Sequence, residues 1–345
     1  MIFALILLVL LGISMLFNVG HFIESALSVG GGSTYHVAGP RLEEVTLKEH
    51  GGHHKIAVVP IEGIITGQRM DKSGFNMVDV IKAQLERAAD DKKVKAVLLK
   101  VDSPGGEVLA SDDIAQAIAD FQTHTNGKPV IVSMGSLAAS GGYYVSAPCR
   151  WIVANELTIT GSIGVIMSTW NYRGLMDKVG VRPFVFKSGK FKDMLSGSKE
   201  PEDITQEEKD MIQKLITETY GKFASVVGEG RSRASNLNAQ QKRKGRSLTD
   251  NWREYADGRI LSGKEAQELG FVDSLGNFDE AAEKAAEIAG IEDYDLVEYR
   301  LHYDLADFFR MFGKSDAKGV RIDLGLEVPK LQAGKLYFLS PTHIP

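Results

Sequence analysis

Ser140 lies between two alanines and two glycines in the stretch SMGSLAASGGYYVSAP, residues 133–148, just after a segment whose apolar residues predict a buried strand. A strand, a sharp turn and small neighbours are typical of a serine nucleophile, although Ala138 replaces the first glycine of the G-x-S-x-G pattern. A serine hydroxyl is a poor nucleophile and needs a base. No histidine lies between residues 125 and 301, and His124 ends a polar helix, so we expect the base to be a lysine.

The stretch FKSGKFKDML, residues 186–195, supplies three candidate bases, Lys187, Lys190 and Lys192. A lysine that acts as a base must be neutral, which requires burial or neighbouring donors that disfavour the ammonium form. Lys192 follows Phe191 and is followed, one residue later, by an apolar pair, so it is the easiest of the three to bury. Two S-x-x-K matches elsewhere lie in polar stretches without the accompanying motifs, and we interpret them as chance.

Three glycine-rich junctions each follow an apolar strand, in the order DSPGG (102–106), AASGG (138–142) and TGSIG (160–164). In an open α/β sheet, ligands bind at the carboxyl ends of the strands, and glycines there let backbone N–H groups approach a ligand closely. An oxyanion hole needs two such donors aimed at one point. We expect them to come from Gly105 or Gly106 together with Gly141; the alternative is that the junctions are only tight turns.

Strands and helices alternate from about Lys55 onward. Apolar stretches that predict strands, such as KIAVVPIEGIIT, VKAVLLKVDSPGG and PVIVSMGS, are separated by stretches with helical spacing, NMVDVIKAQLERAADD and SDDIAQAIADFQTHTNGK. This pattern predicts an α/β fold with a largely parallel sheet that is buried on both faces. Farther on, capping boxes at Thr205–Glu208 and Ser262–Glu265 predict two helix starts, and NFDEAAEKAAEIAG predicts a further amphipathic helix.

The first 20 residues, MIFALILLVLLGISMLFNVG, carry no charged side chain and are long enough to span a bilayer core. No basic residue precedes this run and no clear cleavage site follows it, so an uncleaved transmembrane anchor is favoured over a signal peptide. The predicted organisation is an anchor over 1–20, a flexible connector over 21–54, a catalytic domain over 55–290 and a C-terminal extension over 291–345, where KLYFLSP could add a strand.

The composition limits the kinds of partner and bound group that we expect for this chain. The 345-residue chain has a net charge of −5, which does not favour nucleic acid as a partner. Its single cysteine, Cys149, cannot form an internal disulfide. His50, His53 and His54 lie in HGGHH without a cysteine or carboxylate spaced to complete a metal site, so a solvated loop is favoured, and we expect neither a metal nor a cofactor.

The motifs VDSPGG, GSLAASGGYYVSA, ITGSIGV and SGKFKDM, followed by DGRILSGKEAQELGFVDSLG, resemble the signature of the signal peptide peptidase A family of membrane-associated Ser-Lys proteases. The resemblance covers about residues 55–290 and keeps the order and spacing of the motifs. It implies an α/β spiral fold of repeated β-β-α units, related to the crotonase and Clp protease folds, after an N-terminal transmembrane helix. In this resemblance Ser140 matches the nucleophile, Lys192 the general base, and Ser162 a second serine that hydrogen-bonds the lysine. The oxyanion-hole region matches Gly105, Gly106 and Gly141.

The resemblance also implies a function and a setting. It implies a membrane-anchored serine endopeptidase that degrades signal-peptide remnants and other short apolar peptides through an acyl-enzyme, with the catalytic domain outside the cytoplasm. The chain carries one protease domain where longer members carry two, so a homo-oligomer is implied, an octamer by resemblance, whose sites draw serine and lysine from one chain or from two. Two alternatives stay open: a crotonase-like acyl-CoA enzyme, which shares the fold but not the nucleophile, and a catalytically inactive membrane scaffold.

Overall fold

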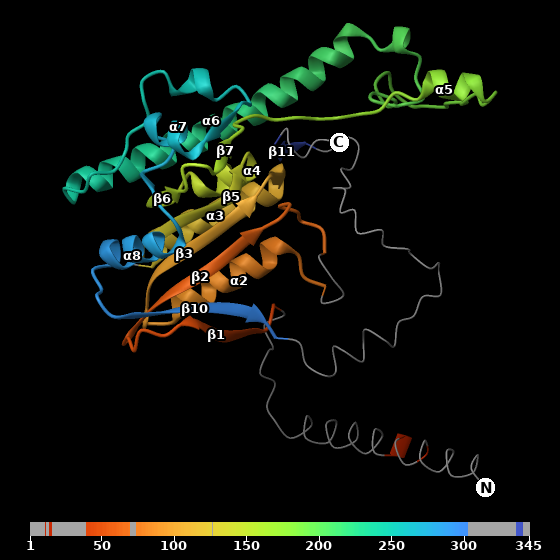
Figure 1. The fold of residues 1–345 in the computed structure, drawn as a ribbon. Helices are drawn as coiled ribbons and strands as arrows, with labels where there is room; N and C mark the ends of the chain where they lie inside the picture. The colour runs from red at the N-terminus through yellow and green to blue at the C-terminus, as the bar shows by residue number, and fades with distance from the viewer. Residues whose placement is uncertain are drawn as a thin grey trace. The chain divides into compact units, whose positions relative to one another are not determined.

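The computed structural model describes residues 39–69, 74–125, 127–302 and 336–340, together with Leu11, Ser14 and Met15. The chain divides into two units, Met1–Gly39 and Pro40–Pro345, and all of the elements considered below belong to the second (Figure 1). The anchor predicted over residues 1–20 lies, apart from those three residues, outside the described part of the chain. Among the residues that are described, no helix is both long enough and apolar enough to cross a membrane.

The described part of the second unit is built around a sheet of nine strands. Seven of them follow the order β1-β10-β2-β3-β5-β6-β9, while β7 pairs with β5 and β8 pairs with β7. Only the β1–β10 and β7–β8 pairings among these are antiparallel, so the prediction of a largely parallel α/β sheet is confirmed. The strands are β1 (Leu42–Lys48), β2 (His54–Glu62), β3 (Val94–Ser103), β5 (Val130–Ala139), β6 (Trp151–Ala154), β7 (Ile159–Gly161), β8 (Ile260–Ser262), β9 (Ser274–Leu275) and β10 (Tyr294–Leu301).

The sheet is buried on both faces because its strands are apolar at successive positions. Side chains alternate between the faces of a strand, so in β2 Ala57 and Val59 pack in one core while Ile56 and Val58 pack in another. The first core includes side chains of the helices α2 (Met77–Asp90), α3 (Val108–His124) and α4 (Gly141–Ser146), and the second is closed by α8 (Phe278–Ala289) (Figure 1). The helices therefore form layers on both faces of the sheet.

The predicted helix starts are also confirmed. Helix α6 (Gln206–Gln240) begins at a capping box in which the Thr205 hydroxyl accepts the Glu208 N–H and the Glu208 carboxylate accepts the Thr205 N–H. Ser262 and Glu265 cap α7 (Gly263–Glu268) in the same way. The short helix α5 (Arg173–Lys178) and the N-terminal end of α6 lie away from the sheet in Figure 1. We call residues 167–205, which connect the sheet to α6, the arm.

The sheet extends beyond the predicted limits of the catalytic domain. Strand β1 lies in the predicted connector and β10 in the predicted extension, and the two pair with each other at one edge of the sheet. The sequence of β1 conceals this role because an edge strand buries few side chains, and none of its residues is fully buried. The stretch KIAVVPIEGIIT, whose sequence predicts a pair of strands, forms one strand instead. Beyond β2, Ile65 makes only an isolated bridge to Gly106.

The C-terminal tail also adds a strand, as KLYFLSP allowed. Strand β11 (Tyr337–Leu339) pairs antiparallel with β4 (Gly105–Glu107), the short strand that follows the turn at the end of β3. Residues more than 200 positions apart in sequence are thus neighbours. The pairing brings the tail to the glycine turn from which oxyanion-hole donors are expected.

A buried ion pair joins α6 to the sheet. The Arg231 guanidinium contacts the Asp273 carboxylate, and neither side chain is exposed to solvent. Asp273 also accepts the Ile152 N–H at 2.9 Å, and Arg231 donates to the Cys149 carbonyl at 3.4 Å. Burial removes both charges from water, and their mutual attraction together with these backbone partners offsets that desolvation cost. Either charge alone would be buried without compensation.

We therefore expect Asp273→Asn to destabilise the protein strongly. The substitution leaves the Arg231 charge buried without a counter-charge, and breaking a buried pair in this way costs ~3–5 kcal/mol of unfolding free energy. Urea denaturation followed by circular dichroism measures the change. Asp257→Asn is the control, because it breaks the solvent-exposed pair with Arg259 and should change stability little. Similar effects of the two substitutions would contradict the assignment.

Candidate active site

The three glycine junctions meet at the carboxyl ends of neighbouring strands. At the end of β3, Ser103 lies opposite Ala138 of β5, and at the end of β5, Ala139 lies opposite Gly161 of β7. Consecutive parallel strands end on the same side of the sheet, so turns that are far apart in sequence come together. The predicted gathering of the junctions is found in the structure.

Ser140 occupies a strained turn between β5 and α4. Its φ of 54° and ψ of −116° lie in a region that residues other than glycine rarely adopt. Two hydrogen bonds hold it there: the Ser140 N–H donates to the Gly161 carbonyl at 2.8 Å, and its carbonyl accepts the Tyr144 N–H at 2.8 Å. The sheet on one side and the first turn of α4 on the other therefore fix the direction of this side chain.

The Ser140 hydroxyl is buried and unpaired. The residue is 1% exposed, and its Oγ has no hydrogen-bond partner anywhere in the described part of the chain. A buried hydroxyl without a partner costs ~1–3 kcal/mol relative to a satisfied one. Such a group in a strained turn is a feature of functional sites rather than of a packed core.

Glycines allow the turn after β3 to contact the start of α4. A Cβ placed on Gly141 would lie 3.0 Å from the Gly105 Cα and 3.1 Å from the Gly106 nitrogen. A Cβ on Gly142 would lie 2.7 Å from the Ser103 carbonyl oxygen, and Gly105 has a φ of 99° that favours glycine. The backbone of Gly105 and Gly106 therefore lies against the residue that follows Ser140, and the Gly105 N–H itself donates to the Ser103 hydroxyl at 3.1 Å.

The tail strand β11 lies across this same point. Phe338 pairs with Gly106 in the β4–β11 ladder. A Cβ on Gly105 would overlap the Phe338 carbonyl oxygen and would lie 2.6 Å from the Gly141 nitrogen. On its other edge, Tyr337 exchanges two backbone hydrogen bonds of 3.1 Å with Ile166. The tail is thus held between two backbone edges as an extended peptide, with a carbonyl beside Gly105 and Gly141.

An aromatic pocket receives the side chain of this strand. The Phe338 ring is fully buried, stacks on Tyr144 with centroids 4.8 Å apart, and lies 4.5 Å from the Phe223 ring. The Tyr144 hydroxyl donates to the Asp112 carboxylate at 2.6 Å. Burial, together with this bond to a carboxylate, raises the pKa of Tyr144, so it remains a neutral donor. The walls of this pocket are aromatic rings, and one of them belongs to Tyr144, which is only four positions after Ser140 in the sequence.

Ser162 lies beside this centre. It follows Gly161, whose carbonyl binds the Ser140 N–H, and it is buried with a φ of 50°. Its own N–H donates to the Arg259 carbonyl at 2.7 Å. The TGSIG turn therefore holds Ser162 near the nucleophile through backbone bonds on both sides.

Lys192 is not brought to Ser140 within this chain. It is exposed on the arm, and its amine forms no hydrogen bond or ion pair with any residue that the structure describes. The prediction that its apolar neighbours bury it is wrong for the single chain. Phe191 and Met194 are themselves half-buried and line two separate small pockets of the arm, which leaves Lys192 pointing to solvent.

The described residues contain no group of three histidine, cysteine, aspartate or glutamate side chains placed to hold a metal ion. His54 of the HGGHH loop instead contacts Asp293 at 3.0 Å, at the opposite ends of the strands from the glycine turns. The sequence predicts the tail strand but not its place at the site, and it gives no sign of the part played by Ile166. Neither has a chemical signature, because both act through backbone groups that any residue carries.

Residues 122–292 match the family described as Peptidase family S49, a range that includes Ser140, Ser162 and Lys192. The Enterococcus faecium protein "Putative signal peptide peptidase SppA" is 36% identical to this chain over 75% of its length and 71% of the relative. "Putative protease slr0021" of Synechocystis sp. is 37% identical, over 79% of this chain and 88% of the relative. "Protease 4" of Haemophilus influenzae is 35% identical, over 70% of this chain and 36% of the relative.

The unpaired hydroxyl predicts an unusual effect on stability. Ser140→Ala removes a buried group that has no partner, so we expect the unfolding free energy to stay level or to rise, by up to ~1–3 kcal/mol. Ser140→Gly should relieve the strained φ as well. Urea denaturation compares both variants with wild type. The control is Ser146→Ala, which removes a buried hydroxyl that donates to the Gly142 carbonyl at 2.7 Å and should destabilise. A clear loss of stability in Ser140→Ala would contradict the geometry.

Proposed function

The chain belongs to peptidase family S49, and from this membership we propose that it is a membrane-anchored endopeptidase in which Ser140 is the nucleophile and Lys192 the general base. The observation that carries the proposal is the buried, unpaired Ser140 hydroxyl beside the glycine turn. An amine that reached this hydroxyl would satisfy it and take its proton. Peptide hydrolysis needs no more than this pair and an oxyanion hole.

The proposed reaction uses each group at one stage. Lys192 accepts the Ser140 proton as Oγ attacks the scissile carbonyl, and the N–H groups of Gly141 and of Gly105 or Gly106 stabilise the oxyanion. The lysine then gives its proton to the leaving amine, which produces the acyl-enzyme. In the second half it activates a water that releases the acyl group. Ser162, held beside Ser140, accepts or donates a hydrogen bond that orients the amine.

The tail strand indicates how a substrate binds. A peptide that replaced β11 would pair with β4 on one edge and with Ile166 on the other, which is recognition by addition of a strand. Its carbonyl would then lie beside Gly105 and Gly141, and an apolar side chain would enter the pocket of Tyr144 and Phe223. This supports short apolar peptides, such as signal-peptide remnants, as the substrate class. From the resemblance alone, we also propose that residues 1–20 anchor the domain at the membrane on its extracytoplasmic side.

We further propose that the dyad forms between copies of the chain. Lys192 lies on an arm that carries exposed aromatic side chains, with Trp170 72%, Phe184 87% and Phe186 96% exposed. An exposed apolar surface of this kind is typical of a binding interface. A second copy that covered the arm could present its Ser140 to this Lys192. The proposed assembly is a ring, an octamer by family resemblance.

The test of the chemistry is labelling by a fluorophosphonate, read by intact-mass spectrometry. Wild type should gain one phosphonyl group per chain, and Ser140→Ala none. A crotonase-like acyl-CoA enzyme or an inactive scaffold would not be labelled in either form. Absence of labelling on wild-type protein with an intact fold would therefore reject the peptidase proposal.

The base assignment predicts that Lys192→Ala abolishes hydrolysis of an apolar peptide, while Lys190→Ala stays within a few-fold of wild type. Lys190 is two positions away on the same loop and pairs with Glu207 at the surface. The wild-type rate should rise with pH, because only a neutral amine can take a proton. A Lys192→Ala rate near wild type would reject the assignment.

The shared site predicts complementation. Ser140→Ala and Lys192→Ala are each inactive alone, and mixing them under conditions of demonstrated subunit exchange should restore part of the activity. Some boundaries then pair an intact serine with an intact lysine. If activity stays absent after exchange, each site lies within one chain, and the Ser-Lys chemistry is unaffected by that result.

The substrate mode predicts that the tail competes with peptides. Phe338→Ala removes the ring that fills the aromatic pocket and should weaken the binding of β11. Because the tail then competes less well for the same place, the KM for an external apolar peptide should fall. A synthetic LYFLS peptide should inhibit competitively, and a scrambled peptide of the same composition serves as the control. An unchanged KM together with no inhibition would mean that substrates bind elsewhere.

A further inference from the structure

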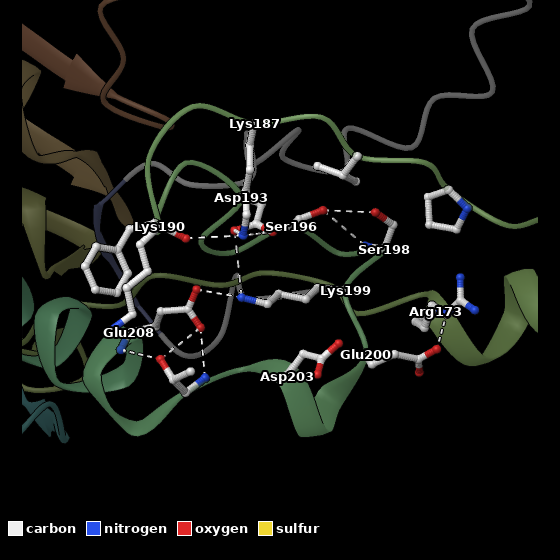
Figure 2. A pocket seen from close by; sticks show the side chains of 14 residues that line it. Arg173, Lys187, Lys190, Asp193, Ser196, Ser198, Lys199, Glu200, Asp203 and Glu208 are labelled. Atoms are coloured by element: carbon white, nitrogen blue, oxygen red, sulfur yellow. Dashed lines mark hydrogen bonds and ion pairs between the residues drawn. The ribbon is translucent and has the colours of Figure 1, made fainter.

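The loop that carries Lys192 has little regular structure to hold it. Residues 187–199 form a series of turns, and the apolar residues that precede them, Val185 and Phe186, are exposed. A general base must nevertheless be presented within a fraction of an ångström of its proton donor. The loop therefore needs another source of order, which the structure supplies as a row of alternating charges (Figure 2).

This row begins next to the base. The amine of Lys187 lies 2.7 Å from both carboxylate oxygens of Asp193, the residue that follows Lys192. The Lys199 amine lies 3.8 Å from the Asp193 carboxylate and donates to Glu208 at 2.7 Å. Figure 2 shows these side chains pointing toward one another from the two sides of the loop and from the start of α6.

The row ends on a rigid element. Glu208 is only 4% exposed, and its second oxygen accepts the Thr205 N–H at 2.8 Å, so the same carboxylate that binds Lys199 also caps α6. Farther along this helix, Phe223 and Val227 are fully buried in the core of the sheet. A continuous chain of contacts therefore runs from the residue beside Lys192 to the core of the protein.

Three members of the row, Asp193, Lys199 and Glu208, are held in their charged forms by their partners. The bond from Lys187 lowers the pKa of Asp193, and the bond from Lys199 lowers the pKa of Glu208. The bond to Glu208 raises the pKa of Lys199. Unlike an isolated surface pair, the side chains of Asp193, Lys199 and Glu208 are largely shielded from solvent, at 16%, 14% and 4% exposed.

We propose that Asp193 and Glu208 are positioning residues for the Lys192 base. The row Lys187–Asp193–Lys199–Glu208 fixes the loop to the N-terminus of α6 and thereby sets the point at which the Lys192 amine is presented to Ser140. Neither carboxylate touches the substrate or the reacting atoms. The inference rests on the proposed function for its catalytic consequence, while the ordering of the loop can be measured separately.

The matched experiment compares Asp193→Asn and Glu208→Gln with Glu207→Gln in the full-length chain. Glu207 lies next to Glu208 in the first turn of α6 and pairs with Lys190 at the surface, so its substitution removes the same charge from the same turn outside the row. We expect the first two variants to lose on the order of 10- to 100-fold in kcat, since displacement of a catalytic group by about 1 Å can cost 10²-fold. KM should stay within twofold, because the peptide binds at β4 and Ile166.

Hydrogen–deuterium exchange supplies the readout that is independent of activity. Amides of residues 187–199 should exchange faster in Asp193→Asn and in Glu208→Gln than in wild type or Glu207→Gln, with the sheet unchanged. Asp193→Glu, which keeps the carboxylate, should recover part of the lost kcat. If Glu208→Gln does not fold, Lys199→Met removes the shared cation without altering either carboxylate and should give the same pattern.

The inference is overturned if kcat of Asp193→Asn stays within twofold of wild type, if KM rises while kcat does not change, or if exchange of the loop is unaffected. An equal loss in Glu207→Gln would also overturn it, because the effect would then be one of general charge. Full activity of Lys192→Ala would instead reject the base assignment. The exchange measurement would still report whether the row orders the loop.

Discussion

The structure depends on the contact between two backbone turns, one at Gly105–Gly106 and one at Ser140–Gly142, which leaves no room for a side chain. A Cβ on Gly141 would lie 3.0 Å from the Gly105 Cα and 2.7 Å from the Ser111 hydroxyl of α3, and a Cβ on Gly142 would lie 2.7 Å from the Ser103 carbonyl oxygen. The approach is possible because β3 and β5 are parallel neighbours whose ends coincide, and because β7 holds the Ser140 N–H from the other side. The unpaired Ser140 hydroxyl and the position of the tail strand β11 beside it both depend on this one contact.

Much of this centre could be predicted from sequence, because its constraints act on residue type. Only small residues fit the turn around Ser140, and strands buried on both faces must be apolar at successive positions, so both leave a readable pattern. The capping boxes at Thr205 and Ser262 are equally local. Each of these features depends on neighbours within a few positions in the chain.

Other features were not predictable, since their determinants are distant in sequence or invisible in composition. The pairing of Phe338 with Gly106 and of Tyr337 with Ile166 uses backbone groups alone. The exposure of Lys192 depends on which of its neighbours turn inward. The row of charges from Lys187 to Glu208 reads as an ordinary solvated stretch, because each member gains its partner only when the loop folds back on α6.

Within one chain, helix α6 connects the region of Ser140 to the loop that carries Lys192. It has 35 residues, which at ~1.5 Å per residue gives a rod about 50 Å long. In its second half, Gly230 lets the helix approach the carbonyl of Ala147 at the end of α4, and Arg231 forms the buried pair with Asp273. Helix α4, whose N-cap is Ser140, therefore packs against the same helix that anchors the Lys192 loop.

This arrangement gives a physical reason for the proposed division of the site between copies. A chain by itself holds a buried hydroxyl without a partner, at a cost of ~1–3 kcal/mol, and exposes aromatic side chains on the arm. Contact between copies would remove both penalties together, since it would cover the arm while it brings an amine to the hydroxyl. The arm must then be stiff, because an amine on a loose loop would lose through disorder what it gains by pairing. The ion pairs of the arm and the unpaired Ser140 hydroxyl would therefore serve the same proposed site. The ion pairs would order the Lys192 loop on one copy, and the hydroxyl would receive the amine on the next copy.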